Sequence, residues 1–312
     1  MIVGSRHAQS FWRRSLVLVA ALAVALTNAL PAEAVAPQTV VATNKAEWKA
    51  AATDQWLAWT VWTGRADIVY AKPVGGSRFR VNRKGSNGVL GAIDGTTLVY
   101  QEFTLGRRGR SSIWFMDLET RTKTKAPGAV NSRQWEYWPS LSGDWLLFAR
   151  HLNTGGRRLY LFNRTTQERR LVASMSRGRR VLLTGQVRGE YVSFEKTTWD
   201  RRGRATSCNV YRYDIASSAT TLIPNPEKKC QWGPSVNDEG TVYFARGGFA
   251  CGRGVSLRSH PIGGPTQVIW QLPKKNSLTT TYAWDREDDA TNVYFGTYKC
   301  GRWADIKMIP GL

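Results

Sequence analysis

Short runs of alternating apolar and polar residues recur along the chain, and the starts of successive runs lie 45 to 51 residues apart. The six runs span residues 68–72, 113–117, 159–163, 210–214, 257–261 and 306–310. Alternation with a period of two predicts β-strands that each have one buried face.

A second apolar segment precedes each of these runs, at residues 56–59, 98–101, 145–148, 191–194, 241–244 and 292–295. Polar turn sequences rich in Gly, Asn and Asp, such as residues 142–144 and 237–240, lead into it. Each unit therefore holds about four short strands. Six such units predict an all-β fold, a six-bladed β-propeller of four-stranded antiparallel blades.

The sixth unit ends in the Pro-Gly turn at residues 310–311, before any fourth strand. Residues 38–42, Gln-Thr-Val-Val-Ala, have the length and pattern of the missing strand. We therefore expect the N-terminal strand to complete the last blade, so that 35–312 forms one propeller domain.

The first 34 residues have the three parts of a secretory signal peptide. Arg6, Arg13 and Arg14 precede an uncharged run over residues 15–30, and Ala-Glu-Ala at 32–34 is a cleavage signal. We expect cleavage after Ala34, export by the Sec or the twin-arginine route, and a secreted or cell-envelope monomer without a membrane span. The alternative is an uncleaved N-terminal anchor, since the apolar run is near the minimum spanning length.

The segment WPSLSGDWLLFA at residues 138–149, followed by the strand at 159–163, resembles the TolB-like β-propeller repeat. WGPSVND at residues 232–238 is the second good match, and the resemblance extends over residues 38–312. It implies an architecture rather than an activity.

Charge is the second strong feature, with 44 Lys and Arg residues against 23 Asp and Glu residues. In a propeller, the connections from the second to the third strand of a blade share one face with the connections between blades. The predicted connections on this face contain 26 basic and seven acidic residues, whereas the hairpins between first and second strands are acidic. We therefore expect one basic face and an anionic partner.

Gly lies beside or near Arg in every predicted connection between second and third strands. The arginine fork suits carboxylate, phosphate or sulfate groups, and a ring of such residues would bind an extended anion. The candidate binding residues are Arg65, Arg108, Arg157, Arg202, Arg253 and Arg302, with Trp199 and Trp303. The expected partner is a cell-wall or extracellular polysaccharide, ahead of nucleic acid, or an acidic protein. The alternative is a solvated surface whose arginines pair within each blade.

Four cysteines in an exported chain predict disulfides. From their positions in the expected blades we predict Cys208–Cys230 and Cys251–Cys300. Zinc is the alternative, although the chain has no paired Cys-x₂-Cys spacing.

We expect no catalytic residues, no cofactor and no metal, because only His151 and His260 follow the signal peptide and no nucleophile motif is present. The alternative is a glycosidase or lyase for acidic polysaccharides, which would need two carboxylates near the axis. A calcium site is an alternative interpretation of the acidic run that contains Asp285, Glu287, Asp288 and Asp289. Trp48, Trp138 and Trp232 recur at the start of a unit and predict wedges between blades.

Overall fold

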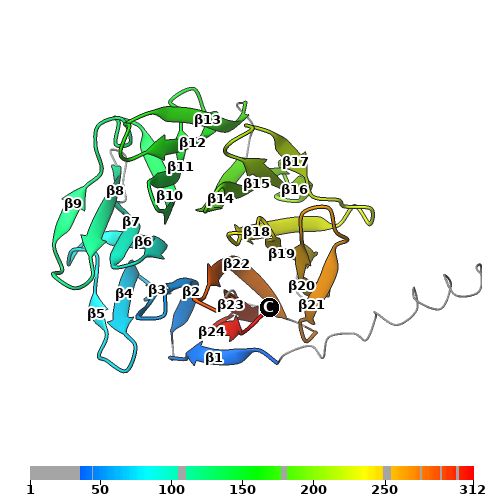
Figure 1. Ribbon diagram of the computed structural model, residues 1–312, viewed down its shortest axis with the longest axis horizontal. Helices are drawn as coiled ribbons and strands as arrows, with labels where there is room; N and C mark the ends of the chain where they lie inside the picture. The colour runs from blue at the N-terminus through cyan, green and yellow to red at the C-terminus, as the bar shows by residue number, and fades with distance from the viewer. Residues whose placement is uncertain are drawn as a thin grey trace, which may run out of the picture. The chain divides into compact units, whose positions relative to one another are not determined.

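The structure is a computed structural model that describes residues 36–43, 45–104, 110–176, 181–248, 254–274, 276–288, 290–299 and 302–312. These residues belong to one compact unit, Val35–Leu312. They form six four-stranded antiparallel sheets, arranged as blades around a central axis (Figure 1). The prediction of an all-β six-bladed propeller is confirmed.

Each blade places its first strand nearest the axis, and the next strands follow outward (Figure 1). Blades 1 to 3 consist of β2 (Ala46–Ala52), β3 (Trp56–Trp62), β4 (Asp67–Pro73) and β5 (Phe79–Arg80); β6 (Asn87–Asp94), β7 (Thr97–Phe103), β8 (Ser111–Asp117) and β9 (Lys123–Lys125); and β10 (Trp135–Ser142), β11 (Trp145–His151), β12 (Arg157–Asn163) and β13 (Arg169–Met175). Blades 4 to 6 consist of β14 (Val181–Arg188), β15 (Tyr191–Trp199), β16 (Ala205–Asp214) and β17 (Thr220–Leu222); β18 (Cys230–Val236), β19 (Val242–Gly247), β20 (Val255–His260) and β21 (Gln267–Gln271); and β22 (Asn276–Asp285), β23 (Thr291–Lys299), β24 (Arg302–Ile309) and β1 (Gln38–Val41).

The hydrophobic core fills the space between and within blades. Phe148, Phe194, Phe244 and Phe295 recur on the second strands of their blades, and each is fully buried. These second strands are buried on both faces, so a short continuous apolar run with Phe at the same place in each unit makes the repeat visible in the sequence.

The sixth blade is closed by the N-terminal strand, as predicted. β1 pairs antiparallel with β24, with Gln38 opposite Met308 and Thr39 opposite Lys307. The ammonium of Lys307 donates a hydrogen bond of 3.0 Å to the Thr39 hydroxyl. The two ends of the propeller therefore share one sheet.

The innermost strands of blades 1, 3 and 5 are interrupted by a β-bulge at the same register. Trp48, Tyr137 and Trp232 are the last regularly paired residues before it. Lys49, Trp138 and Gly233 follow, and all three have left-handed backbone angles, with φ of 54°, 46° and 60°. The prediction that Trp138 shares the register of Trp48 and Trp232 is therefore wrong, because the bulge offsets it by one residue.

Cys208 of β16 and Cys230 of β18 form a disulfide that joins blades 4 and 5, with Cα atoms 4.9 Å apart. This predicted pair is confirmed. Cys251, Cys300 and the predicted signal peptide lie outside the described residues. No helix in the described part of the chain is long and apolar enough to cross a membrane.

Candidate functional site

Four of the predicted binding residues, Arg65, Arg157, Trp199 and Arg202, have described side chains. Arg65 and Arg202 lie in exposed connections of blades 1 and 4, and Trp199 ends β15. Arg108 and Arg253 lie outside the described residues, as do the side chains of Arg302 and Trp303. Among these four described side chains, Arg157 lines a cavity.

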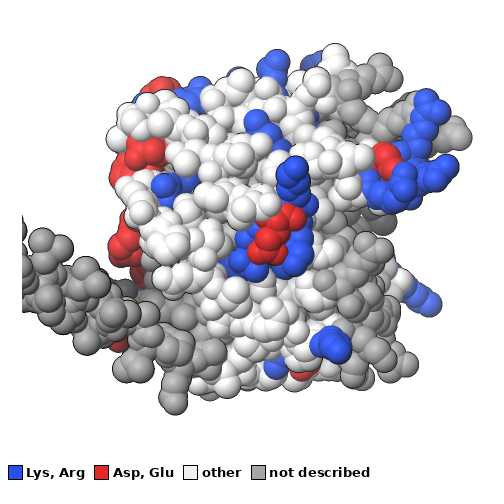
Figure 2. All heavy atoms as spheres, turned by 90° about the vertical axis from the view of Figure 1, so that its right-hand side faces the viewer, with Lys and Arg blue, Asp and Glu red and all other residues white. Residues whose placement is uncertain are grey.

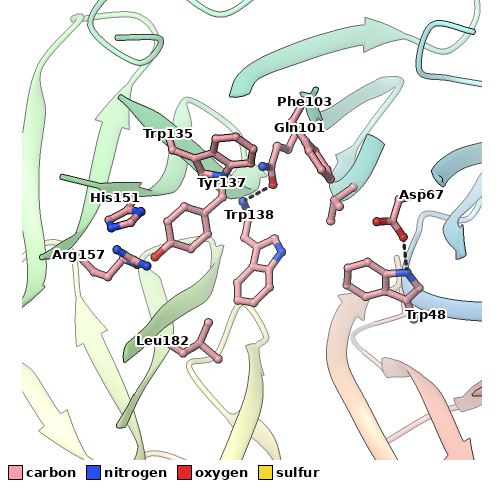
Figure 3. Close-up of a pocket in the computed structure, with 11 residues that line it drawn as sticks. Trp48, Asp67, Gln101, Phe103, Trp135, Tyr137, Trp138, His151, Arg157 and Leu182 are labelled. Carbon is pink, nitrogen blue, oxygen red and sulfur yellow. Dashed lines mark hydrogen bonds between the residues drawn. The ribbon is translucent and has the colours of Figure 1, made fainter. Parts of the chain in front are cut away.

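That cavity, here called the mouth cavity, has a volume of about 410 Å³ and lies where the first strands of blades 1 to 4 begin. Its walls are mainly aromatic, and Figure 3 shows the side chains grouped around it. The aromatic residues are Trp48, Phe103, Trp135, Tyr137 and Trp138, and the polar ones are Asp67, Gln101, His151 and Arg157.

Hydrogen bonds hold the walls in place. The Trp48 indole N–H donates to the Asp67 carboxylate at 3.2 Å. On the other side, the backbone N–H of Trp138 donates to the Gln101 amide oxygen at 3.4 Å (Figure 3). The rings of Tyr137 and Trp138 meet edge to face, with centroids 5.6 Å apart. A wall fixed in this way loses little side-chain entropy when a ligand binds.

A second cavity of about 510 Å³, here called the rim cavity, lies beside it between blades 2 and 3. The two cavities share Trp135 and His151, so they adjoin at these side chains, and together they are here called the groove. The remaining residues of the rim cavity include three cations, Arg110, Lys125 and Arg133, and no carboxylate among the described residues. The groove is therefore cationic along its outer half.

Buried Glu136 supports the groove from below. Its carboxylate accepts from Arg150 Nε at 2.9 Å and from the backbone N–H of Ser132 at 3.2 Å. Arg150 also donates to the Val130 carbonyl at 2.8 Å. These bonds fix the connection from β9 to β10, which carries Arg133. Because the glutamate charge is paired internally, the exposed cations above it stay available to a ligand.

The titratable groups of the mouth cavity are tuned by burial. Burial and the nearby Arg157 charge lower the pKa of His151, so its imidazole is neutral at pH 7 and can donate or accept one hydrogen bond. Burial also raises the pKa of Tyr137, which keeps its hydroxyl protonated. Arg157 is thus the permanent cation of this cavity, and Asp67 contributes a carboxylate that the Trp48 indole N–H binds.

Below the mouth cavity the six first strands enclose a narrow channel, with a cavity of only about 30 Å³. Thr184, Thr280 and Lys49 contribute polar side chains to its wall. Close backbone contact explains the narrowness, since a Cβ at Gly91 would lie 2.5 Å from the Pro139 carbonyl oxygen.

At the opposite end of the first strands, carboxylates from several blades meet one guanidinium. Arg188 lies 3.1 Å from Asp238, 3.6 Å from Asp285 and 3.8 Å from Asp94. It also stacks on Trp284, 4.0 Å from the ring centroid. Three carboxylates thus share one cation. Within the described part of the acidic run no metal-ligand cluster forms, Asp288 pairs with Arg286, and Asp289 lies outside the described residues.

Sequence reasoning missed most of the residues that line the groove. Trp48 and Trp138 were predicted to be wedges between blades, and both line the mouth cavity. Trp232 does bridge blades, because its indole N–H donates to the Leu278 carbonyl at 2.9 Å. The bulge position holds Lys49 in blade 1 and Trp138 in blade 3, but Gly233 in blade 5. A large residue at this position is the sequence signal that separates the blades whose tryptophan lines the cavity from the blade whose tryptophan bridges to its neighbour.

Comparison with known proteins identifies the fold. No family model matches the chain, and no curated protein matches its sequence. Among solved structures, TolB from Acinetobacter baumannii is similar at 16% identity and a TM-score of 0.52, over 83% of this chain and 65% of TolB.

The β-propeller domain of the Trilobed protease from Pyrococcus furiosus is similar at 11% identity and a TM-score of 0.53, over 85% of this chain and 96% of that domain. An oligogalacturonate lyase from Vibrio parahaemolyticus has a TM-score of 0.48 at 10% identity, over 87% and 80% of the two chains. Identities this low establish the fold alone. By fold, the chain is a six-bladed β-propeller similar to that of TolB.

Proposed function

We propose that the chain is a non-catalytic binding propeller that holds an anionic polysaccharide in the groove formed by the mouth and rim cavities. The observation that carries this proposal is that two cavities adjoin at Trp135 and His151. A ligand that fills both would meet an aromatic wall at one end and a row of cations at the other.

The chemistry of the walls favours a sugar. The apolar face of a sugar ring packs on an indole, and its hydroxyls would bond to Gln101 and His151. Carboxylate or sulfate groups farther along the chain would pair with Arg110, Lys125 and Arg133. An acidic protein of rigid shape would instead need a broad, flat contact area.

The chain as a whole supports an anionic ligand, since its formal net charge is +21. Viewed edge-on, the propeller has Asp and Glu side chains gathered at one margin and Lys and Arg side chains projecting at the other (Figure 2). The groove opens between connections of the kind predicted to be basic.

Titration calorimetry with a heparin-derived hexasaccharide tests the proposal. We expect binding that weakens as salt is added, because the contacts are charged. Trp135→Ala should weaken binding about tenfold, as should Arg157→Gln, since each removes an interaction of roughly 1.4 kcal/mol.

Two charge-matched controls are Arg65→Gln and Arg202→Gln, which alter exposed arginines of other connections. They should change affinity less than twofold. Equal losses in all four variants would show diffuse charge attraction instead of a groove. Tighter binding of single-stranded DNA or of an acidic protein than of the hexasaccharide would overturn the ligand class.

A further inference from the structure

Lys49 lies where the mouth cavity meets the central channel. It is the bulge residue of β2, and its side chain lines the channel. Its ammonium nitrogen lies over the ring of Trp138, 5.9 Å from the centroid, although the two residues belong to blades 1 and 3. Because Trp138 lines the mouth cavity and Lys49 lines the channel, this contact between the lysine and the indole lies between the two cavities.

The backbone at this point is strained for a lysine. Its φ of 54° lies in the left-handed region that favours glycine, and blade 5 has Gly233 in the same bulge. Trp138 is strained in the same way, with φ of 46°. Non-glycine residues held in this region concentrate at binding sites, where the surrounding structure supports them. Here the two strained residues contact each other.

Among the described residues, the ammonium of Lys49 has no counterion. None of the ion pairs among the described residues includes Lys49. Burial lowers the pKa of its ammonium to about 7, with no contribution from a neighbouring charge. An unpaired ammonium in this environment gains more from an incoming anion than an exposed lysine would.

Several titratable groups on the strands around Lys49 form hydrogen bonds or ion pairs with other residues. Glu47 of β2 accepts from the Thr43 hydroxyl, and Asp67 of β4 accepts from Trp48. Glu136 of β10 binds Arg150. Asp94 of β6 accepts from the Gly143 N–H, Tyr282 of β22 donates to the Ile93 carbonyl, and Lys307 of β24 donates to Thr39.

Three more titratable groups lie on β24 and around the mouth cavity. Asp305 acts on Glu47, whose pKa is raised mainly by burial and further by this charge. His151 has a lowered pKa and is neutral above pH 7, and Arg157 stays charged. Lys49 therefore titrates near pH 7, as does Glu195, whose carboxylate accepts from the backbone N–H of the channel residue Gly233.

We propose that Lys49 anchors one anionic group, a carboxylate or a sulfate, of a sugar held in the mouth cavity against Trp138. This inference deepens the proposed function and rests on it for the ligand class. The hydroxyls of Thr184 and Thr280 also line the channel and can donate to the same anion. Because the anion stabilises the charged lysine, binding takes up a proton above pH 7, and affinity falls as the pH rises.

The pKa of Lys49 can be followed directly from the pH dependence of its acetylation, read by mass spectrometry. We expect glucuronate to raise that pKa by about one unit, which should slow acetylation about twofold at pH 8 and about tenfold at pH 6. Exposed Lys45 serves as the internal control and should not respond. Glucose, which has no charge, should leave Lys49 unchanged, and glucose 6-sulfate shows whether sulfate replaces carboxylate.

The variant Lys49→Gly removes the ammonium and suits the left-handed backbone, so it should fold at least as well as the native chain. We expect its affinity for glucuronate to fall at least tenfold and to lose its dependence on pH between 7 and 8.5. An unchanged Lys49 pKa with both charged sugars, or equal affinity in Lys49→Gly, overturns the inference.

The two proposals fail separately. If the heparin hexasaccharide does not bind while glucuronate still shifts the Lys49 pKa, the groove assignment is wrong and the lysine site stands. If the hexasaccharide binds and responds to Trp135→Ala but not to Lys49→Gly, the groove stands and the anchor is wrong.

Discussion

The backbone N–H of Gly233 donates a hydrogen bond to the carboxylate of Glu195, and this bond joins the first strand of blade 5 to the second strand of blade 4. Glu195 is 2% exposed, and no ion pair of the described residues includes it. Burial therefore raises the pKa of its carboxyl to about 7, against 4.5 for an ordinary glutamate.

This shift makes the propeller less stable as the pH rises. Below pH 4.5 the carboxyl is neutral in both states, and between about 4.5 and 7 only the folded state keeps the proton. Folding stability thus falls across that window, by roughly 3 kcal/mol in total from this group. Glu195→Gln should flatten the dependence measured by urea denaturation between pH 4.5 and 8, whereas exposed Glu119→Gln should not. The same pH slope in both variants would contradict the assignment.

Arg188 is expected to hold the acidic end of the propeller together, because three blades supply the carboxylates around it. Arg188→Met should lower the free energy of unfolding by about 3 kcal/mol at pH 8, since Asp238 and Asp285 lose their cation. Burial raises the pKa of Asp238 to about 6, so the loss should be smaller at pH 5.

The control for this experiment is Arg286→Met, because Arg286 forms a more exposed pair with Asp288 on the same side. That variant should change stability by less than about 1 kcal/mol. An equal loss in both variants would show that Arg188 acts as an ordinary surface charge.

The disulfide between Cys208 and Cys230 closes a segment with a sequence separation of 22. Replacing both cysteines by serine should lower stability by about 3 kcal/mol, the value expected for a loop of this length. Thermal unfolding measures the loss. Each single serine variant should lose as much as the double variant, and a single variant as stable as the native chain would exclude this disulfide.

Deletion of residues 38–42 should destabilise the whole ring, because β24 then has an unpaired edge. We expect a lower melting temperature and a broader transition, followed by calorimetry. A synthetic peptide of residues 36–43 should restore part of the loss. An unchanged, cooperative transition would show that β1 is dispensable.

The fold could be predicted from the sequence because every blade repeats the same buried positions. Phe148, Phe194 and Phe244 occupy one place in successive units, and the cost of exposing such side chains preserves the pattern. Strand β1 could be predicted for a related reason, since the sixth unit lacked one strand.

The groove could not be predicted in the same way. The residues of the mouth cavity come from four blades. Trp48 of blade 1 and Arg157 of blade 3 line the same cavity only once the blades have packed together. The bulge also shifts Trp138 by one position relative to Trp232, which no alignment of strand patterns reveals. Side-chain direction at a bulge depends on local backbone angles, which hydrophobic periodicity does not encode.

The pairing of β1 with β24 has a consequence for how the chain acquires its structure. Thr39 and Lys307 are separated by 268 residues, so the sixth sheet gains its outermost strand only after almost the entire polypeptide has been synthesised. Contacts of such long range form late and slow folding. We therefore expect the pairing of β1 with β24 to be the last step in assembly of the ring. Until that step, the unpaired edge of β24 is exposed to chaperones and proteases.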